Sequence, residues 1–441
     1  MSNENTRLPK ASSETITVEG QEITEDPVFR QIVRCYCTNV VRSHGPLSGF
    51  RVLDLTRIVA GPYCTMILGD LGADVIKVER LKTGDESRKW GPPFMKNSTD
   101  SCYFMANNRN KRSICIDIKS TIGKEIIYKL AEQSDVLVEN YVPGKLDAMN
   151  LGYEDLKKVN PQLIYCSITG YGSKGPYAKR PGYDVIAASL GGLLHITGPK
   201  NGEPCKVGVA MTDIATGLYA HGAILAALLQ RSRTATGQKI ECNLLSTQVS
   251  TLINIGSNYL NAGSEAQKWG TAHESIVPYE SFPTRTGYIT VGAGSDDQFK
   301  FLCKRLSAYD LMSDEKYSTN AVRVKNREGL ITSLREIFAR KSTEEWLNIL
   351  EGAPFPYAPI NNLKEVFDDE HIKAIGIVKD ISHNIYGSVK MVGPPVEYSN
   401  MESKVLRPPP MLGEHTEEVL MELLEYDLAK IATLRSQRII Q

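Results

Sequence analysis

Asp213 is the residue in this sequence best placed for covalent chemistry. Apolar residues follow it at helical spacing as far as Gln230, which predicts that Asp213 lies in the first turn of a long helix. An aspartate there can cap the helix, since its oxygens accept hydrogen bonds from free N–H groups. It can also be a carboxylate nucleophile, because the same N–H groups and the helix dipole favour its ionised form. The two interpretations are compatible, and other residues must decide between them.

Two stretches, residues 80–89 and 109–112, are rich in cations. Charge runs of this kind usually form a solvated surface. Arginines at strand-end loops can also hold phosphate groups by bidentate hydrogen bonds, so phosphate binding is the alternative interpretation. The cations are Arg80, Lys82, Arg88, Lys89, Arg109, Lys111 and Arg112.

A glycine-rich turn is the third candidate for chemistry. Gly292 and Gly294 flank Ala293 after a predicted strand and just before a predicted helix. A plain strand-to-helix turn is sufficient to explain two glycines. The functional alternative is a mobile loop that closes over a reaction centre.

The composition excludes several classes of function. The 441 residues carry 51 basic and 51 acidic side chains, so no large basic field indicates nucleic acid as the partner. The nine cysteines contain no C-x-x-C pair and the seven histidines no metal-ligand spacing, so we expect no metal site. No apolar run is long enough for a membrane span, and we expect no membrane insertion.

The helices and strands around the candidate residues must position them. From residue 47 onward, the sequence pattern predicts alternating strands and helices. The alternation predicts a doubly wound, Rossmann-like α/β domain over residues 47–262, with its ligand crevice at the carboxyl ends of the strands. The predicted strands are 50–55, 73–78, 113–118, 135–139 and 163–168, and the predicted helices are 62–71, 122–133 and 151–159. The expected crevice segments are 57–62, 79–80, 140–145 and 170–175.

The second half of the chain differs in kind. A helix over residues 239–262 is predicted to leave the large domain, and 263–360 to form a smaller α+β domain. The prolines of residues 353–359 favour an extended linker at its end. Residues 361–441 are expected to return to the large domain through a helix, a hairpin at Gly387 and a last helix from about Glu414.

The first strand-to-helix turn argues against a dinucleotide cofactor. It runs from Thr56 to Pro62 and lacks the G-x-G-x-x-G fingerprint. A nicotinamide or flavin oxidoreductase is therefore disfavoured.

From residue 47 to about 424 the chain resembles the class III CoA-transferases, the family of formyl-CoA and crotonobetainyl-CoA transferases. Each matching stretch is weak alone, and it is their order and spacing that make the resemblance specific. They are residues 51–57, 60–62, 68–80, 110–113, 138–140, 143–144, 170–172, 212–213, 291–294 and 412–416.

The resemblance implies a mechanism and a set of contacts. The aspartate that matches Asp213 is the family nucleophile, and the glycine loop of Gly292 and Gly294 covers the reaction intermediates. No cofactor is bound permanently, since coenzyme A thioesters are the substrates. The resemblance also implies an interlocked homodimer. The implied CoA contacts are Val59, Ala60, Arg80, Lys119, Asn140, Tyr183 in the loop 181–184, and Lys145, which stands one helical turn before a family arginine replaced by Ala148.

Within the family, the resemblance is closest to members that move CoA from succinyl-CoA to glutarate or a similar dicarboxylate. Another acid, an α-methylacyl-CoA racemase or a CoA-binding protein without turnover remain alternatives, although Tyr183 replaces the histidine that a racemase would use as a base. The distal carboxylate of a dicarboxylate needs a partner, and Arg109 and His273 are the candidates. Arg109 could instead be a surface or phosphate contact, and His273 a structural residue.

Residues 1–46 form an N-terminal extension of two parts. An acidic stretch comes first, and a basic amphipathic segment with Arg30, Arg34 and Arg42 follows. The segment resembles a mitochondrial presequence, although the preceding acids do not fit one. Mitochondrial location is the expectation and the cytoplasm the alternative; a surface helix would explain the same pattern.

Overall fold

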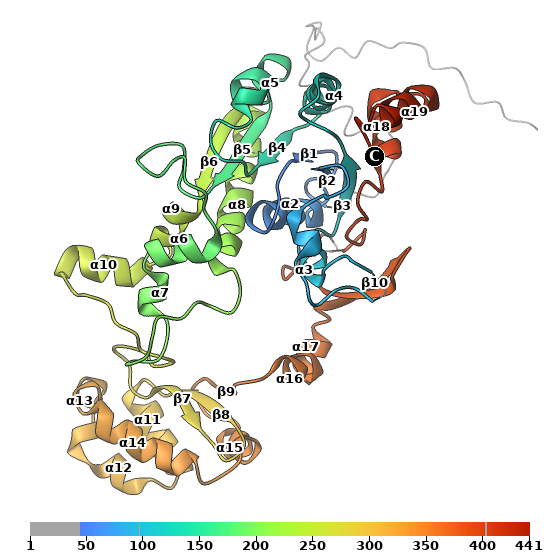
Figure 1. Cartoon of the computed structure of the whole chain (residues 1–441). Helices are drawn as coiled ribbons and strands as arrows, with labels where there is room; N and C mark the ends of the chain where they lie inside the picture. Colours follow the sequence, from blue (N-terminus) through green and yellow to red (C-terminus); the bar gives the residue numbers. More distant parts are fainter. Residues whose placement is uncertain (1–44, 97, 402–403) are drawn as a thin grey trace, which may run out of the picture.

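A computed structural model describes residues 45–96, 98–401 and 404–441 of the chain. Six parallel strands form its central sheet in the order β3-β2-β1-β4-β5-β6 (Figure 1). This order reverses direction between β1 and β4, as in a doubly wound fold, so the predicted fold class of the large domain is confirmed. The strands are β1 (Arg51–Asp54), β2 (Asp74–Glu79), β3 (Lys111–Cys115), β4 (Val136–Glu139), β5 (Ile164–Thr169) and β6 (Gln238–Asn243).

Helices cover both faces of the sheet because successive residues of each strand point to opposite sides. Val52 and Val138 pack beneath α2 (Ala60–Asp70) and α8 (Met211–Thr234), in one core. Leu53 and Leu137 belong to a second core on the other face. The helices of that face are α4 (Thr121–Glu132), α5 (Tyr153–Val159), α18 (Thr416–Leu424) and α19 (Leu428–Ser436).

The prediction of one helix over residues 239–262 is wrong. Gln238–Asn243 forms β6, followed by α9 (Leu244–Ser250) and α10 (Ile253–Ala262). β6 pairs with β5 along its whole length, and no other described strand pairs with its far side. An edge strand tolerates polar side chains, so Lys239 and Glu241, which form an ion pair at 2.8 Å, concealed the strand pattern. The Asn243 side chain caps α9 by accepting from Ser246 N–H at 2.7 Å.

The small domain has a core of its own, formed by apolar residues between Val277 and Tyr357. Its antiparallel sheet consists of β7 (Tyr279–Pro283), β8 (Tyr288–Gly292) and β9 (Tyr357–Pro359). β9 lies in the stretch that was predicted to be a linker, because three residues suffice to pair with β8. The helices are α11 (Asp296–Arg305), α12 (Tyr309–Ser313), α13 (Asn320–Lys325), α14 (Arg327–Phe338) and α15 (Thr343–Leu350).

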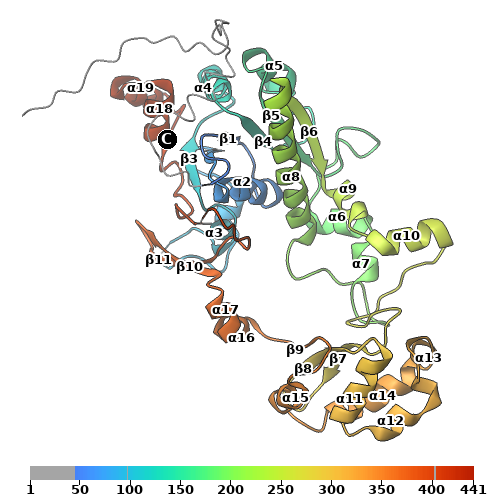
Figure 2. The ribbon, with the colours of Figure 1, turned by 180° about the vertical axis from the view of Figure 1, so that it is seen from behind.

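Two separate connections join the small domain to the large one (Figures 1 and 2). The first follows α10, and the second passes through α16 (Leu363–Asp368) and α17 (Glu370–Ala374) to the predicted hairpin at Gly387, which is β10 (Val378–His383) and β11 (Gly387–Val392). Within the described residues, no helix or strand of the small domain packs extensively on one of the large domain. Short elements complete the chain: η1 (Glu86–Lys89), α3 (Cys102–Ala106), η2 (Asp147–Met149), α6 (Asp184–Leu190), α7 (Leu193–Ile196) and η3 (Glu315–Tyr317).

Two expectations concern segments beyond this core. The N-terminal segment with Arg30, Arg34 and Arg42 lies outside the described residues. Among the described helices, α8 alone has the length and apolar composition of a membrane span, with 44% of that window buried in the protein.

Candidate active site

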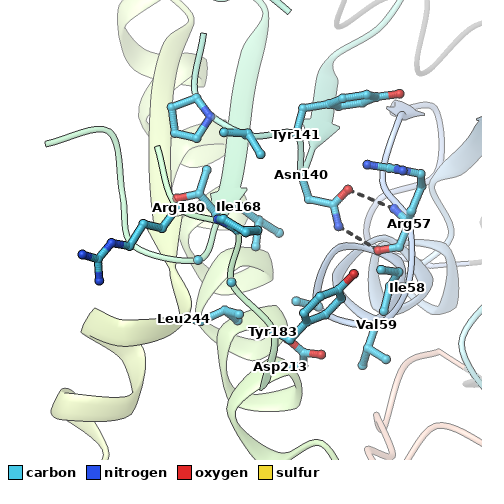
Figure 3. A pocket seen from close by; sticks show the side chains of 17 residues that line it. Arg57, Ile58, Val59, Asn140, Tyr141, Ile168, Arg180, Tyr183, Asp213 and Leu244 are labelled. Atoms are coloured by element: carbon cyan, nitrogen blue, oxygen red, sulfur yellow. Dashed lines mark hydrogen bonds between the residues drawn. The ribbon is translucent and has the colours of Figure 1, made fainter. Parts of the chain in front are cut away.

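A cavity of about 180 Å³ lies at the carboxyl ends of β1, β4 and β5 (Figure 3). It opens where the strand order reverses, between β1 and β4, which is where doubly wound folds bind their ligands. Three of the four predicted crevice segments contribute to it, together with Asp213 from α8. Its lining consists of residues 57–60, 140–143, 168–170, 180–183, Asp213 and Leu244.

Asp213 reaches this cavity because α8 and α2 pack at very short range. A Cβ atom on Gly217 would lie only 2.8 Å from the Ala60 carbonyl oxygen, so the contact requires glycine. Gly217 is one helical turn after Asp213, and Ala60 is the first residue of α2. The helix contact therefore places the carboxylate beside the loop that ends β1.

Asp213 lies in the first turn of α8, as predicted, but it does not cap the helix. The capping carboxylate is Asp184, which accepts a hydrogen bond from the Asp213 N–H at 3.0 Å. The Asp213 side chain itself makes no capping hydrogen bond and is 9% exposed. The interpretation of Asp213 as a cap is wrong, and its carboxylate is left without a fixed partner in the described structure.

The electrostatic surroundings of Asp213 also differ from the expectation. Burial, and then the negative charge of Asp184, raise the pKa of Asp213 to about 7. Desolvation outweighs the N–H groups that were expected to keep the carboxylate ionised. A carboxylate with this pKa is ionised in a large fraction of molecules at neutral pH and is a stronger base than an ordinary aspartate. Both properties suit a nucleophile.

Four of the predicted CoA contacts line the cavity: Val59, Ala60, Asn140 and Tyr183. Figure 3 shows Asp213 below the Tyr183 ring, with Val59 across from it. The Asn140 side chain is already engaged, because its amide accepts from Arg57 N–H at 3.0 Å and donates to Arg57 C=O at 2.7 Å.

The other three predicted CoA contacts lie outside the cavity. Arg80 lines a neighbouring hollow next to Arg57, and both guanidinium groups bind the Glu86 carboxylate. Lys119 and Lys145 are exposed on the same edge of the sheet, in the segments that follow β3 and β4. The structure thus brings four predicted contacts to Asp213, places one beside them and leaves two on the surface.

The basic stretch at residues 109–112 does not form a phosphate site. Arg109 is buried and holds Asp70 through two hydrogen bonds of 2.9 and 2.6 Å, while its third nitrogen donates to Val392 C=O. Lys111 pairs with Asp54 at 3.0 Å and Arg112 with Asp74 at 2.6 Å. These placements speak against Arg109 as the partner of a substrate carboxylate, because its donors are committed to internal groups.

His273 and the glycine turn belong to the small domain, away from this cavity (Figure 1). The His273 ring stacks on Tyr279 at 5.5 Å, and its Nδ1 accepts from Ser275 N–H at 3.1 Å. Gly292 ends β8, and the Gly294 C=O accepts from the buried Arg323 at 3.1 Å. Within one chain these residues do not meet Asp213.

The structure identifies two residues that the sequence patterns missed. Arg180 lines the cavity beside the predicted segments, although its side chain points away from Asp213 (Figure 3). Tyr103 of α3 does not line the cavity, but its pKa is raised, first by burial and then by the charges of Asp213 and Asp184. No motif surrounds Tyr103, so only tertiary packing reveals it. Among the described residues, no group of three or more His, Cys, Asp or Glu could hold a metal ion.

The sequence profile described as CoA-transferase family III matches residues 47–416. The chain belongs to this family. It is 52% identical to the succinyl-CoA:glutarate CoA-transferase of Homo sapiens, with 90% of each chain covered. It is 40% identical to the succinate–glutarate CoA-transferase of Agrobacterium fabrum, covering 88% of this chain and 98% of that one. A crystal structure of a CAIB/BAIF family protein from Brucella suis superposes with a TM-score of 0.79 at 40% identity, covering 86% of this chain and all of that one.

Proposed function

We propose that this family III protein transfers CoA from succinyl-CoA to glutarate or a similar dicarboxylate, with Asp213 as the covalent nucleophile. The observation that carries the proposal is the Asp213 carboxylate: it lines the cavity, has no hydrogen-bond partner among the described side chains, and has its pKa raised by burial and by Asp184 to about 7. The named relatives supply the two substrates.

The proposed reaction is a sequence of four acyl transfers. The Asp213 carboxylate attacks the succinyl-CoA carbonyl carbon, the C–S bond breaks, and a mixed anhydride and CoA thiolate form. The thiolate then attacks the Asp213 carbonyl carbon and releases succinate, which leaves an aspartyl-CoA thioester. Glutarate attacks this thioester to give the second anhydride and thiolate. The thiolate finally takes the glutaryl group and restores the Asp213 carboxylate.

The distal carboxylate of the acceptor needs a hydrogen-bond donor, and the proposed candidate in place of Arg109 is Tyr103, a half-exposed residue on whose hydroxyl the charges of Asp213 and Asp184 act. A tyrosine hydroxyl keeps its proton at neutral pH, because its ordinary pKa is about 10, and can therefore donate a hydrogen bond. Tyr103→Phe should weaken glutarate more than butyrate as an acceptor, by about 1–3 kcal/mol in kcat/KM. Equal losses of kcat/KM with glutarate and butyrate would show that Tyr103 does not bind the distal carboxylate.

The proposed function is tested by offering a panel of acids with succinyl-CoA and separating the acyl-CoA products by chromatography. Glutaryl-CoA should form at the rate at which succinyl-CoA is consumed, and Asp213→Asn should form none. Free CoA without a new acyl-CoA would indicate a thioesterase and contradict the proposal. A faster reaction with a monocarboxylate than with any dicarboxylate would contradict the substrate class.

We also propose that the active form is an interlocked homodimer in which the glycine turn of one chain covers the cavity of the other. Two observations support this: Gly292 and Gly294 lie away from Asp213 within one chain, and α10 exposes large apolar side chains. Ile253 is 77% exposed and Leu260 83%, which is unusual unless a partner covers them.

Co-expression of two inactive variants tests this assembly. A Cβ on Gly292 would meet its neighbours only at 3.7 Å or more, so Gly292→Asp should fold, whereas a Cβ on Gly294 would lie 2.6 Å from Ile276. In a mixed dimer of Gly292→Asp and Asp213→Asn, one cavity receives both an intact aspartate and an intact turn. Restored activity is expected, and a mixed dimer without activity would contradict the shared site.

The N-terminal extension, residues 1–46, is proposed to direct the protein to mitochondria. The support is its basic amphipathic segment around Arg34. A fluorescent protein fused behind residues 1–46 should colocalise with mitochondria, and a diffuse signal would favour the cytoplasm.

A further inference from the structure

Ile58, in the loop between β1 and α2, has an unusual backbone conformation. Its φ is +76°, in the left-handed region, which strongly disfavours a β-branched residue. Such conformations are strained and persist only when the surroundings enforce them. Ile58 lines the cavity, two residues before the start of α2. The strained residue therefore lies directly beside the proposed reaction centre.

Buried side chains from other segments hold the backbone on both sides of this residue. Lys77 of β2 donates to Thr56 C=O at 2.8 Å. Asp85 accepts from Ile58 N–H, with its two oxygens at 3.0 and 3.2 Å. The Asn140 amide binds both the N–H and the C=O of Arg57. Three consecutive residues are thus fixed by groups distant in sequence.

Lys77 and Asp85 form an ion pair of 3.0 Å in which both side chains are fully buried. Removing two charges from water costs several kcal/mol per ion, so a buried pair is rarely present for stability alone. Burial acts to raise the pKa of Asp85, but the Lys77 charge and the hydrogen bonds from Ser87 and Ile58 together outweigh it, and the net pKa lies below the ordinary value. Asp85 is therefore a permanent anion, and the Ile58 N–H donates to a charged acceptor.

The groups after Ile58 have no such restraint. The N–H groups of Val59 and Ala60 have no hydrogen-bond acceptor among the described residues, and both residues line the cavity with Asp213. As the first N–H groups of α2, they are expected to be free unless a ligand or water binds them. The direction in which they point is set by the backbone at Ile58.

We propose that Ile58, Asp85 and Lys77 are positioning residues: the buried pair holds Ile58 in its left-handed conformation, which aims the Val59 and Ala60 backbone at the reacting acyl group. This inference rests on the proposed CoA transfer. None of the three side chains needs to touch a reacting atom, because Asp85 and Lys77 act through the backbone of residues 56–58. A displacement of about 1 Å at such a centre can cost about a hundredfold in rate.

Relieving the strain is the sharpest test. Ile58→Gly removes the cost of the left-handed φ and should raise the unfolding temperature while lowering kcat by about tenfold to a hundredfold. The KM for succinyl-CoA should change less than kcat. If the left-handed conformation of Ile58 had only a structural role, Ile58→Gly would be more stable without any loss of kcat. A gain in stability together with a loss of kcat therefore indicates a positioning role.

Two controls accompany Ile58→Gly. Ala235, with φ +52° at the exposed end of α8, offers the same relief of strain far from the cavity, and Ala235→Gly should be stabilised with parental kcat. Ile58→Ala removes most of the side chain but keeps the Cβ atom, and it should retain more turnover than Ile58→Gly. Equal kcat in Ile58→Gly and the parent would overturn the inference.

A double-mutant cycle tests the link to the buried pair. Asp85→Asn keeps an acceptor for Ile58 N–H but removes its charge, and it should lower kcat in the parent. If Asp85 acts through Ile58, the same change in the Ile58→Gly background should lower kcat much less. Fully additive losses of kcat would show that Asp85 does not act through Ile58. A parent without transfer to any acid would instead refute the proposed function.

Discussion

The two ends of the central sheet both carry a cavity and a cluster of charges, yet they differ in what the charges do. At the amino ends of β1 to β3 the cavity is the larger, about 390 Å³. Its charged residues bind one another, with Asp74 shared by Arg51 at 3.0 Å and Arg112 at 2.6 Å. At the carboxyl ends the cavity is about 180 Å³, and the Asp213 carboxylate is left without a side-chain partner.

This difference shows that neither cavity size nor charge density identifies the candidate site. Of the two cavities, the one at the amino end is the larger, but the Arg51, Asp74 and Arg112 side chains that line it bind one another. The carboxyl end combines an unpaired carboxylate, a strained residue at Ile58 and free N–H groups at the start of α2. Incomplete pairing and backbone strain are the better indicators of function.

The largest expected effect comes from Asp213→Asn, which removes the unpaired charge but preserves shape. Transfer should fall by at least about a thousandfold, as for loss of a covalent nucleophile. The folded-state pKa of Asp213 is raised from 3.8 to about 7, so its ionisation destabilises the native state progressively between these values. At pH 8 the free energy of unfolding of the variant should therefore exceed that of the parent by about 1–3 kcal/mol, and the variant should unfold at a higher temperature, with little difference at pH 4.

Turnover and thermal unfolding at both pH values check this prediction, with mass spectrometry to exclude deamidation to aspartate. Near-parental turnover would show that Asp213 is not the nucleophile, and that the carboxyl end, like the amino end, supplies no reacting group.

The next largest effect is expected from Gly217→Ala, which separates α8 from α2. The added Cβ would lie 2.8 Å from the Ala60 C=O, so the helices must move apart and carry Asp213 away from the loop. We expect about a tenfold loss of kcat. Gly222→Ala on the same helix is the matched control, since a Cβ there meets nothing within 4 Å. Equal rates in the two variants would show that the close contact does not position the nucleophile.

A smaller effect is expected from Asp184→Asn, which removes the neighbouring charge but keeps an oxygen for the Asp213 N–H. The charge of Asp184 contributes to the raised pKa of Asp213, second to burial. Without it the pKa should fall, so the rise of kcat/KM with pH should shift to lower pH by roughly one unit. Profiles from pH 5 to 9 measure the shift. An unchanged midpoint would mean that burial alone sets this pKa.

The smallest effect on turnover is expected at the amino end. Arg112→Met removes a cation shared by Asp74, Glu418 and Glu422, which should lower the free energy of unfolding by about 1–3 kcal/mol. The kinetics should stay within about twofold of the parent. Urea titration measures the free energy of unfolding, and steady-state kinetics measure kcat. A tenfold loss of kcat would contradict a purely structural role for the charges at the amino end of the sheet.

Much of this fold could be predicted because its core strands are short apolar runs separated by helical periodicity. Phe50–Leu55 and Ala73–Val78 illustrate this: each predicted strand lies within two residues of an observed one. β6 was missed because its edge position allows the alternation of Lys239 and Glu241. β9 was missed because prolines conceal a three-residue strand.

The candidate site was partly predictable for a similar reason. Strand ends are local features, so Val59 and Asn140 could be assigned to one crevice before their contacts were known, whereas Asp213 was placed only at the start of a helix and given its role by the family resemblance. The partner of Arg109 could not be assigned, because Asp70 lies 39 positions away and meets it only through tertiary packing. The capping role of Asp184, 29 positions before Asp213, escaped prediction on the same ground.

The return of the chain to the large domain has a consequence for its synthesis on the ribosome. The core on one face of the sheet joins Leu53 of β1 to Val419 and Leu434 in the last two helices. α4 and α5 cover part of that face early, but the part that α18 and α19 cover stays exposed until nearly the whole polypeptide has emerged. The core of the small domain is contiguous, from Val277 to Tyr357, and can assemble earlier. The large domain therefore completes this core only after the small domain has been synthesised, and a nascent chain that ends before α18 leaves part of the core exposed.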